Sequence, residues 1–404
     1  MTETTHPAPA RTRLAGLVDD LRSRLAGNLG ALPVVFGLVL IWVVFQLINP
    51  SFLSADNLVN LTLQCAAGGT IAIGVVLVLL LGQIDLSVGS VSGLAAAILG
   101  VGLTQLGWPL VVAIVAALAA GAAVGLLYGA LFTRFGVPSF VITLAGLLGV
   151  LGLQLKVLGP TGSINLPPDS LLVQFATNWF LPPYVAYLLA VLWAGWMFTA
   201  SVLRRRRRAR AGLPTSPLVW QAAKAGALLA LCVLAVSYLA TNRGVGVMFV
   251  FFIALVIVMD VLLTRTRWGR EVYAVGGSVE AARRAGIRVN RVYVSVFVLC
   301  STFAVVGGLL AAGRLMSVNL NSGGGDTNLN AIAAAVIGGT SLFGGRGSAW
   351  SALLGIAVIQ SISNGLTLLN LDSSIRYMIT GGVLLLAVII DSLSRRSRAA
   401  HGQA

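Results

Sequence analysis

The sequence predicts an all-α polytopic membrane protein, and three observations support that prediction. Hydrophobic residues make up 57% of the 404 residues, charged residues only 10%, and the mean hydropathy is +0.94. Soluble domains carry about 25% charged residues, so this chain could not cover a soluble fold with polar side chains. Long apolar runs recur along the chain, and the basic residues stand mostly in the polar segments between them. These features exclude a soluble fold.

Twelve apolar runs are candidates for membrane-spanning helices. A span needs roughly 20 apolar residues to cross a hydrocarbon core about 30 Å thick. The runs at 87–106 and 328–343 are rich in Gly, Ser and Ala, so each is either a full span or a broken, re-entrant helix. We expect about twelve transmembrane helices, with ten or eleven as alternatives, near residues 31–49, 60–81, 87–106, 109–132, 137–157, 184–203, 218–240, 245–264, 293–313, 328–343, 347–368 and 374–393.

The basic residues predict which side of the membrane each segment faces. Lys and Arg gather in the cytoplasmic loops of membrane proteins. With the N-terminus inside and twelve crossings, the basic regions at 204–210, 265–292 and the C-terminal tail all fall on the cytoplasmic side. We therefore expect the following division of the chain: a cytoplasmic tail over 1–30, a transmembrane domain over 31–393 with an outer loop at 158–183 and a cytoplasmic loop at 265–292, and a cytoplasmic tail over 394–404.

The residues that most enzymes and metal sites require are missing from the apolar part of the sequence. Neither Lys156 nor Lys224 stands in a G-x-x-x-x-G-K-[ST] loop, so we expect this chain not to hydrolyse ATP itself. His6 and His401 lie in the polar tails, and the three cysteines stand singly in apolar runs. We expect no catalytic residue, no metal site and no cofactor. The net charge of +15 follows membrane topology, so we expect no nucleic-acid partner.

A short helix is predicted within the largest cytoplasmic loop. Ser278 can cap its N-terminus, and Glu280 would lie in the first turn, where a negative charge suits the helix dipole. Ala281 and Ala282 are good helix formers, and Gly286 is a natural stop after the C-terminus. Such a short, rigid helix would suit docking into a groove on a soluble partner. An ordinary amphipathic surface loop is the alternative.

Three segments resemble the motifs of one family of transport proteins. They are GQIDLSVGS at 82–90, AVGGSVEAARRAGIRV at 274–289 and IGGTSLFGGRGS at 337–348. In this order they are similar to the ribose/xylose-type sugar permeases of ABC importers, over about residues 31–393. The family usually has Asn where this chain has Ser278, and Ser also caps helices. The additional residues around 174–243 resemble the longer, xylose-type members.

The resemblance implies an ABC importer permease architecture in which the helix at Ser278–Gly286 is the coupling helix to the ATPase. It implies a transmembrane permease subunit of an ATP-driven sugar importer in the bacterial inner membrane, with a pentose such as xylose as cargo. A separate cytoplasmic ATP-binding cassette ATPase would hydrolyse ATP. A periplasmic or lipid-anchored binding protein would deliver the sugar. Two copies of the chain, or one copy with a similar partner, would form the pathway across the lipid bilayer.

Two other functions stay open on the sequence alone. One is a branched-chain amino-acid permease of the related importer group, which would need charged or anion-facing groups along its path. The other is an ion-coupled secondary transporter, in which Asp85 and Asp260 would carry the coupling. Uptake that survives ATP depletion and collapses with an uncoupler would favour the secondary transporter.

A few polar residues in the apolar runs are candidates for the pathway or its gate. Asp85 is a carboxylate in an apolar setting, which is a functional-site hypothesis by default. With Gln83 and Ser87 it could instead cap a broken helix end, so we expect a structural or gating role, with sugar contact as the alternative. Asn364 could line a path or bond neighbouring helices. The Asn- and Gly-rich stretch 314–330 is expected to form a turn that meets the binding protein, although its amides could also bind sugar hydroxyls.

Overall fold

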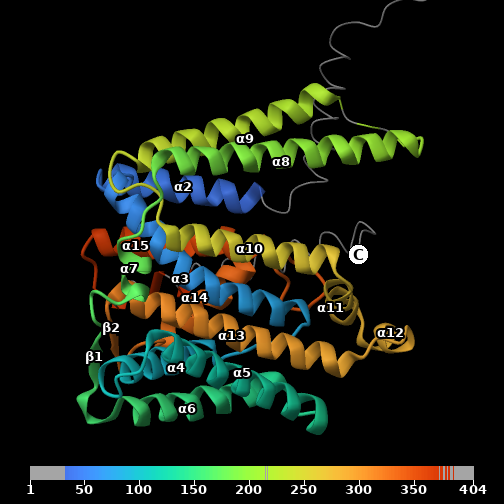
Figure 1. Cartoon of the computed structure of the whole chain (residues 1–404). Helices are drawn as coiled ribbons and strands as arrows, with labels where there is room; N and C mark the ends of the chain where they lie inside the picture. Colours follow the sequence, from blue (N-terminus) through green and yellow to red (C-terminus); the bar gives the residue numbers. More distant parts are fainter. Residues whose placement is uncertain are drawn as a thin grey trace, which may run out of the picture.

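The computed structural model is a bundle of long helices that lie roughly side by side (Figure 1). The structure describes residues 32–213, 215, 217–372, 374, 375, 378, 379, 381, 382 and 385. Each expected apolar run from 31–49 to 347–368 coincides with a helix. The two expected tails lie outside the described residues, and so does most of the last expected span, 374–393.

The helices begin and end close to the expected positions. In chain order they are α2 (Leu32–Ile48), α3 (Ala55–Leu80), α4 (Val88–Thr104), α5 (Leu110–Phe135), α6 (Ser139–Leu158), α7 (Leu171–Thr177), α8 (Pro183–Arg210), α9 (Leu218–Leu239), α10 (Val247–Arg265), α11 (Arg267–Gly277), α12 (Val279–Arg284), α13 (Val289–Leu315), α14 (Gly325–Ile337) and α15 (Trp350–Leu368). A 3-10 turn, η1 (Gly159–Thr161), follows α6.

The expected count of twelve spans is not confirmed. Within the described residues, eight helices are long and apolar enough to cross a membrane: α3, α5, α6, α8, α9, α10, α13 and α15. Helices α2 and α4 are apolar but shorter. Helix α14 has 13 residues, and at 1.5 Å per residue it is about 20 Å long, short of the roughly 30 Å hydrocarbon core. The run at 328–343 therefore forms a half-length helix, because the chain turns at Gly338 and Gly339.

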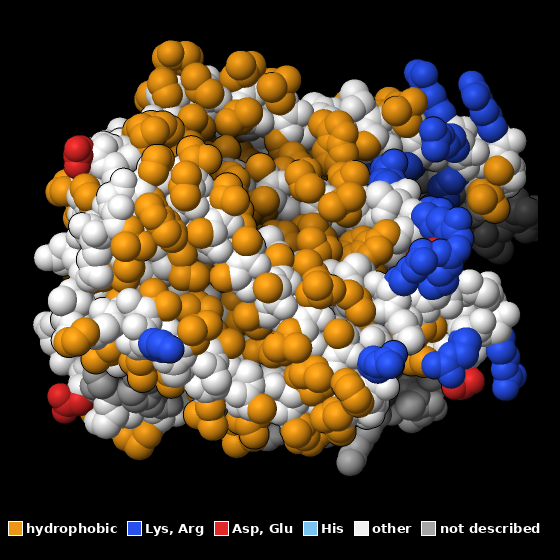
Figure 2. Space-filling model, turned by 60° about the horizontal axis from the view of Figure 1, so that its bottom comes forward, with side chains coloured by type: hydrophobic (Ala, Val, Ile, Leu, Met, Phe, Trp, Pro, Cys, Tyr) orange, Lys and Arg blue, Asp and Glu red, His pale blue; other side chains and the backbone are white. Residues whose placement is uncertain are grey.

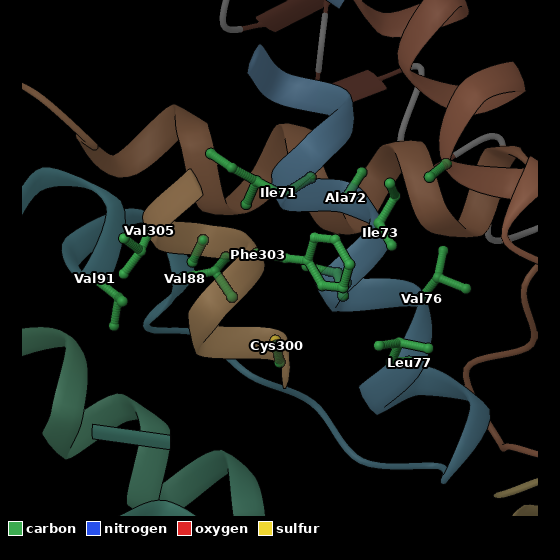
Figure 3. Packing of buried hydrophobic residues seen from close by; sticks show 14 of the residues in the cluster. Ile71, Ala72, Ile73, Val76, Leu77, Val88, Val91, Cys300, Phe303 and Val305 are labelled. Carbon is green, nitrogen blue, oxygen red and sulfur yellow. The ribbon is translucent and has the colours of Figure 1, made fainter. Parts of the chain in front are cut away.

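Helices α3 and α13 form the centre of the bundle. In the most apolar 18-residue stretch of α3, 89% of the residues are buried, against 11% in that of the peripheral α9. A Cβ built at Gly74 would lie 2.8 Å from the carbonyl oxygen of Cys300, so the two backbones are in direct contact. Small residues permit such close approach in lipid, where no hydrophobic force drives helices together. Figure 3 shows Cys300 and Phe303 of α13 among the α3 side chains Ile71, Ala72, Ile73, Val76 and Leu77.

A small antiparallel sheet joins two outer segments that are distant in sequence. Strand β1 (Ser163–Asn165) pairs with β2 (Ser317–Asn319), with Ile164 opposite Val318. Both central side chains are buried. The sequence predicts only loops at 158–183 and 314–330, because two three-residue strands leave no recognisable alternation. The sheet fixes the end of the bundle opposite α12 (Figure 1).

Charged residues gather at the ends of the bundle and apolar residues cover its sides. Figure 2 shows hydrophobic side chains over most of one face and Lys and Arg along one edge. The C-terminal end of α8, with the arginines of 204–210, lies at the same end of the bundle as α11 and α12 (Figure 1). The two basic regions that were expected to share one side of the membrane therefore share one end of the structure.

Candidate coupling site and central helix crossing

The helix predicted at Ser278–Gly286 is present as α12. The Ser278 hydroxyl accepts a hydrogen bond from the backbone N–H of Ala281 at 3.3 Å, which is the expected N-terminal cap. Glu280 lies in the first turn, and Gly286 follows the helix with a φ of 80°. Ala282 is buried against the bundle, while the other side chains of the helix are mostly exposed. Helix α12 therefore projects a short, capped, accessible surface.

Helix α11 connects α12 rigidly to the bundle. The Tyr273 hydroxyl donates a hydrogen bond to the carbonyl oxygen of Gly347 at 2.8 Å. Burial raises the pKa of the Tyr273 phenol and the carboxylate of Asp260 adds to the rise, so the phenol keeps its proton and acts as the donor. A Cβ at Gly276 would overlap the carbonyl oxygen of Leu80, at the C-terminal end of α3.

The three motifs that carry the family resemblance meet at this point. We call residues 338–348 the Gly-rich loop. Its Gly345 N–H donates to the carbonyl oxygen of Leu80 at 2.9 Å, and a Cβ at Gly344 would lie 2.8 Å from the Gly276 oxygen and 2.9 Å from the Gly82 nitrogen. The end of α3, the end of α11 and the Gly-rich loop thus form one tightly packed junction of backbones, next to the accessible α12.

Residues 82–87 lead from this junction to the N-terminus of α4. Asp85 is fully buried in this segment. One of its carboxylate oxygens accepts hydrogen bonds from the N–H and the hydroxyl of Ser87, at 2.8 and 2.7 Å, and the other faces the Cys300 thiol at 3.6 Å. The Leu86 N–H donates to the Thr143 hydroxyl at 3.1 Å. Asp85 therefore bonds to Ser87, directly before α4, and contacts α13 through Cys300.

The N-termini of α4 and α14 cross in the interior of the bundle. The Asn328 side-chain oxygen of α14 accepts a hydrogen bond from the Gly89 N–H of α4. A Cβ at Gly93 would overlap both Ser322 and the side chain of Gln154. Gln154 is completely buried on α6 and donates to the Ser322 carbonyl oxygen at 2.9 Å. Two helix starts that enter the bundle from opposite ends are thus locked together by amides and glycines.

The structure separates the four residues named as pathway or gate. Asp85 and Ser87 bond to each other, and the half-buried Gln83 lies beside them, with its amide 3.4 Å from the Leu81 carbonyl oxygen. Asn364 lies elsewhere, on α15, in a reciprocal pair with Asn57 of α3 at 2.8 and 2.9 Å. Asn364 thus bonds two helices together, which was the alternative to a path-lining role.

Several polar residues at the crossing and beside it were not predicted from the sequence. Thr143, Gln154 and Asn328 are all buried, and each bonds to a segment distant from it in sequence. Gln154 could have been noticed as an amide inside an apolar run, where polar side chains commonly serve as interhelical contacts. Nothing in the sequence singled out Thr143, because Thr is common in membrane helices.

A polar cavity of about 460 Å³ lies at the opposite end from α12. Arg243 donates to the Asn60 side-chain oxygen at 2.7 Å and lies 3.5 Å from Asp56. Arg314, in the last turn of α13, lines the same cavity. The stretch 314–330 contributes a turn as expected, with Gly323 at a φ of 70°, but it also forms β2 and the start of α14.

Fold and site together define a polytopic α-helical membrane protein with a projecting helix at one end and a crossing of the starts of α4 and α14 inside. The chain belongs to the family described as branched-chain amino acid transport system / permease component, whose sequence profile matches residues 57–388. The resemblance that the three motifs indicated is confirmed by individual relatives. No solved structure matches the chain.

The relatives include sugar permeases of both expected types. The xylose transport system permease protein XylH of Escherichia coli K12 is 35% identical over 351 residues, which cover 86% of this chain and 87% of that protein. XylH of Haemophilus influenzae is 35% identical over 355 residues, covering 86% and 91%. The ribose import permease protein RbsC of Escherichia coli K12 is 32% identical over 359 residues, covering 88% and 91%.

Proposed function

We propose that this chain is the transmembrane permease subunit of an ATP-driven sugar importer, with a pentose such as xylose as its cargo. The observation that carries the proposal is the junction of the three motifs beside the accessible α12. A transporter that is driven by a separate ATPase subunit needs such a rigid contact between an exposed docking element and the helices that move. The cargo is inferred from the relatives, which are named as xylose and ribose permeases.

In this mechanism α12 docks into a groove on a cytoplasmic ATPase, which supplies the energy. Closure of an ATPase pair would displace α12, and α11 would carry the displacement to the end of α3 through Gly276 and Leu80. Residues 82–87 would pass it to α4 and to Asp85, which is bonded to α13. Movement of packed helices as rigid bodies is an ordinary way of switching access. Ser278, Glu280, Ala281, Ala282 and Gly286 form the docking element.

The remaining partners follow from the two ends of the bundle. We place α12 and both termini in the cytoplasm and the chain in the bacterial inner membrane, because the basic regions gather at that end (Figure 1). The polar cavity with Arg243 and Arg314 would then face a periplasmic or lipid-anchored binding protein. Two copies of the chain would enclose the pathway. Discrimination between sugars belongs to the binding protein, since tight binding along the path would hinder release.

Transport in reconstituted vesicles tests the function. The permease would be combined with a matching ATP-binding cassette ATPase and a sugar-binding protein, and xylose, ribose and leucine would be offered as cargo. Leucine is included because the family description names branched-chain amino acids. We expect ATP-dependent uptake of a pentose that an uncoupler does not abolish. Uptake driven by an ion gradient without ATP, or uptake of leucine alone, would refute the proposal.

Labelling of a single cysteine tests the orientation. Cys65, Cys232 and Cys300 would be replaced, and one cysteine introduced at the exposed Arg284 of α12. A membrane-impermeant maleimide should label it in inverted vesicles and not in intact cells. Labelling in intact cells would place α12 outside and exclude coupling to a cytoplasmic ATPase.

A further inference from the structure

Helices α8 and α9 form a hairpin that stands apart from the rest of the bundle. They pack chiefly on each other. In their most apolar 18-residue stretches, only 17% of the residues of α8 and 11% of those of α9 are buried. Large apolar side chains on the hairpin are exposed, among them Leu188, Leu192, Trp196, Leu231 and Leu234. In a membrane protein such a surface contacts lipid chains. The coupling junction and the central crossing do not involve the hairpin.

A strongly basic pocket of about 600 Å³ lies between α8 and α9, at the end of the bundle that carries α12. Five cationic side chains line it: Arg204, Arg205, Arg207, Arg208 and Lys224. None of the lining residues is acidic, and residues 183–239 contain no Asp or Glu. The ion pairs found among the described residues involve none of these five cations. The pocket therefore concentrates positive charge without a counter-ion from the part of the chain that the structure describes.

Two side chains of the pocket are arranged to meet an anion at the membrane surface. The Nε of Arg205 is buried and has no hydrogen-bond partner among the described residues, so a donor of the pocket wall lacks an acceptor. Lys224 lies over the ring of Trp220, 5.5 Å from its centre. Tryptophan and lysine side chains are typical of the interface between lipid headgroups and hydrocarbon. The pocket thus opens at headgroup level.

We propose that this pocket binds the phosphate headgroup of an anionic phospholipid from the adjacent leaflet. A guanidinium presents paired donors that match phosphate oxygens, and basic pockets between membrane helices suit such headgroups. The acyl chains would lie along the exposed apolar side chains of α8 and α9. The bound lipid would neutralise the arginines and hold the loosely packed hairpin in place within the membrane. The proposal depends on the membrane placement of the chain and not on its cargo or its ATPase.

Native mass spectrometry of the purified, delipidated full chain tests the proposal. The probes are phosphatidylglycerol, cardiolipin and zwitterionic phosphatidylcholine, each with matched acyl chains. The test variant is Arg205→Gln with Lys224→Gln. The control, Arg206→Gln with Arg210→Gln, removes the same number of positive charges near the same end of the hairpin, at positions on α8 that do not line the pocket. Because each cation near an anionic lipid contributes to binding, we expect the test variant to retain the anionic lipids roughly tenfold less well, and the control to change by less than about threefold.

Four results would overturn the proposal. Equal losses in the two variants would mean that the arginines act only as a diffuse charge, and equal retention of phosphatidylcholine by the unaltered chain would mean no selectivity. Competition by inorganic phosphate at millimolar concentration would indicate a site for the free ion. Unchanged lipid retention in the test variant would mean that the pocket does not hold the lipid. The comparison of lipids on the unaltered chain needs no variant, and the assay contains neither ATPase nor sugar, so its outcome is independent of the transport test.

Discussion

The backbone of Gly276 lies directly against the carbonyl oxygen of Leu80, with no space for a side chain between them. The same oxygen accepts a hydrogen bond from the Gly345 N–H at 2.9 Å. Leu80 is the last residue of α3, the most deeply buried of the long helices, and Gly276 lies three residues before α12 begins. The projecting helix and the centre of the bundle are therefore connected through backbone contacts, which cannot yield as flexible side chains do.

Replacement of Gly276 by alanine tests this contact. The added methyl group must push α11 away from the end of α3, because the overlapping atom is a backbone oxygen. Overpacking of this kind costs typically about 1–3 kcal/mol. We expect ATP-driven uptake to fall about tenfold or more in Gly276→Ala, with the purified ATPase still bound. Gly277→Ala is the matched control, since a Cβ there meets nothing within 4 Å. Equal loss in both variants would contradict a role for the contact.

Substitutions of Gly286 test whether the turn after α12 matters, and they do so without a change in packing. Its φ of 80° is a left-handed conformation, and a Cβ there meets nothing within 4 Å. A residue other than glycine costs roughly 1–2 kcal/mol in this conformation, whereas asparagine tolerates it better. We expect Gly286→Ala to weaken binding of the purified ATPase to the permease in nanodiscs about tenfold, and Gly286→Asn to weaken it less than about threefold. Equal affinities for the two variants would show that α12 does not need this turn.

Two substitutions of Asp85 test whether its buried carboxylate stabilises the fold or takes part in transport. Asp85→Ala leaves the N–H and the hydroxyl of Ser87 without their acceptor, and each buried unsatisfied donor costs about 1–3 kcal/mol. Asp85→Asn keeps one oxygen as an acceptor. We expect the alanine variant to have a much lower thermal unfolding midpoint in detergent than the asparagine variant, which should retain most of its transport.

The opposite pattern would favour an ion-coupled transporter. If Asp85 carried protons or a cation, Asp85→Asn would abolish uptake while its unfolding midpoint stayed close to that of the unaltered protein. Cys300→Ala serves as the control, because it removes only the weak thiol contact at 3.6 Å from the same carboxylate. It should leave both uptake and the unfolding midpoint nearly unchanged.

The features that could be predicted from the sequence are those set by local chemistry. The helix at Val279–Arg284 follows from a Ser cap, helix-forming alanines and a glycine that permits a positive φ, all within nine residues. The spans follow from hydropathy, because in lipid each segment must satisfy its own backbone. Hydropathy could not show that α14 is half-length. The apolar run continues past Ile337 to Leu342 and Phe343, while the backbone has already turned at Gly339.

The contacts that make the candidate site could not be predicted, because they join residues far apart in the chain. Gly82, Gly276 and Gly344 come from three separate motifs, and nothing local to any motif indicates that they touch. The resemblance to permeases rests on all three motifs, but it does not indicate that the motifs contact one another. Asn364 shows the same limit, since an amide in an apolar helix can line a path or bond a neighbour, and only its partner decides between them.

The pair of Asn57 and Asn364 offers a direct measurement of that decision. Each side-chain amide donates to the other's oxygen, at 2.8 and 2.9 Å, and Asn57 also donates to the Phe52 carbonyl oxygen at 2.6 Å. Asn364→Leu leaves a buried amide without its partner, so we expect a lower unfolding midpoint in detergent. In a double-mutant cycle with Asn57→Leu, the coupling free energy should lie between about 0.6 kcal/mol, the average for polar pairs between membrane helices, and about 1.7 kcal/mol, the maximum.

Transport separates the two roles of Asn364. If the residue only joins α3 to α15, uptake by Asn364→Leu should fall no further than the loss of folded protein explains. Trp42→Phe is the matched control, because Trp42 of α2 donates to Ser361 one turn earlier on α15, and its loss removes one interhelical bond of similar length. A stable Asn364→Leu protein that no longer transports, beside an active Trp42→Phe protein, would return Asn364 to the pathway. In that case the two hydrogen bonds between Asn57 and Asn364 would break during each transport cycle, because an amide that is engaged in both bonds cannot bind the cargo.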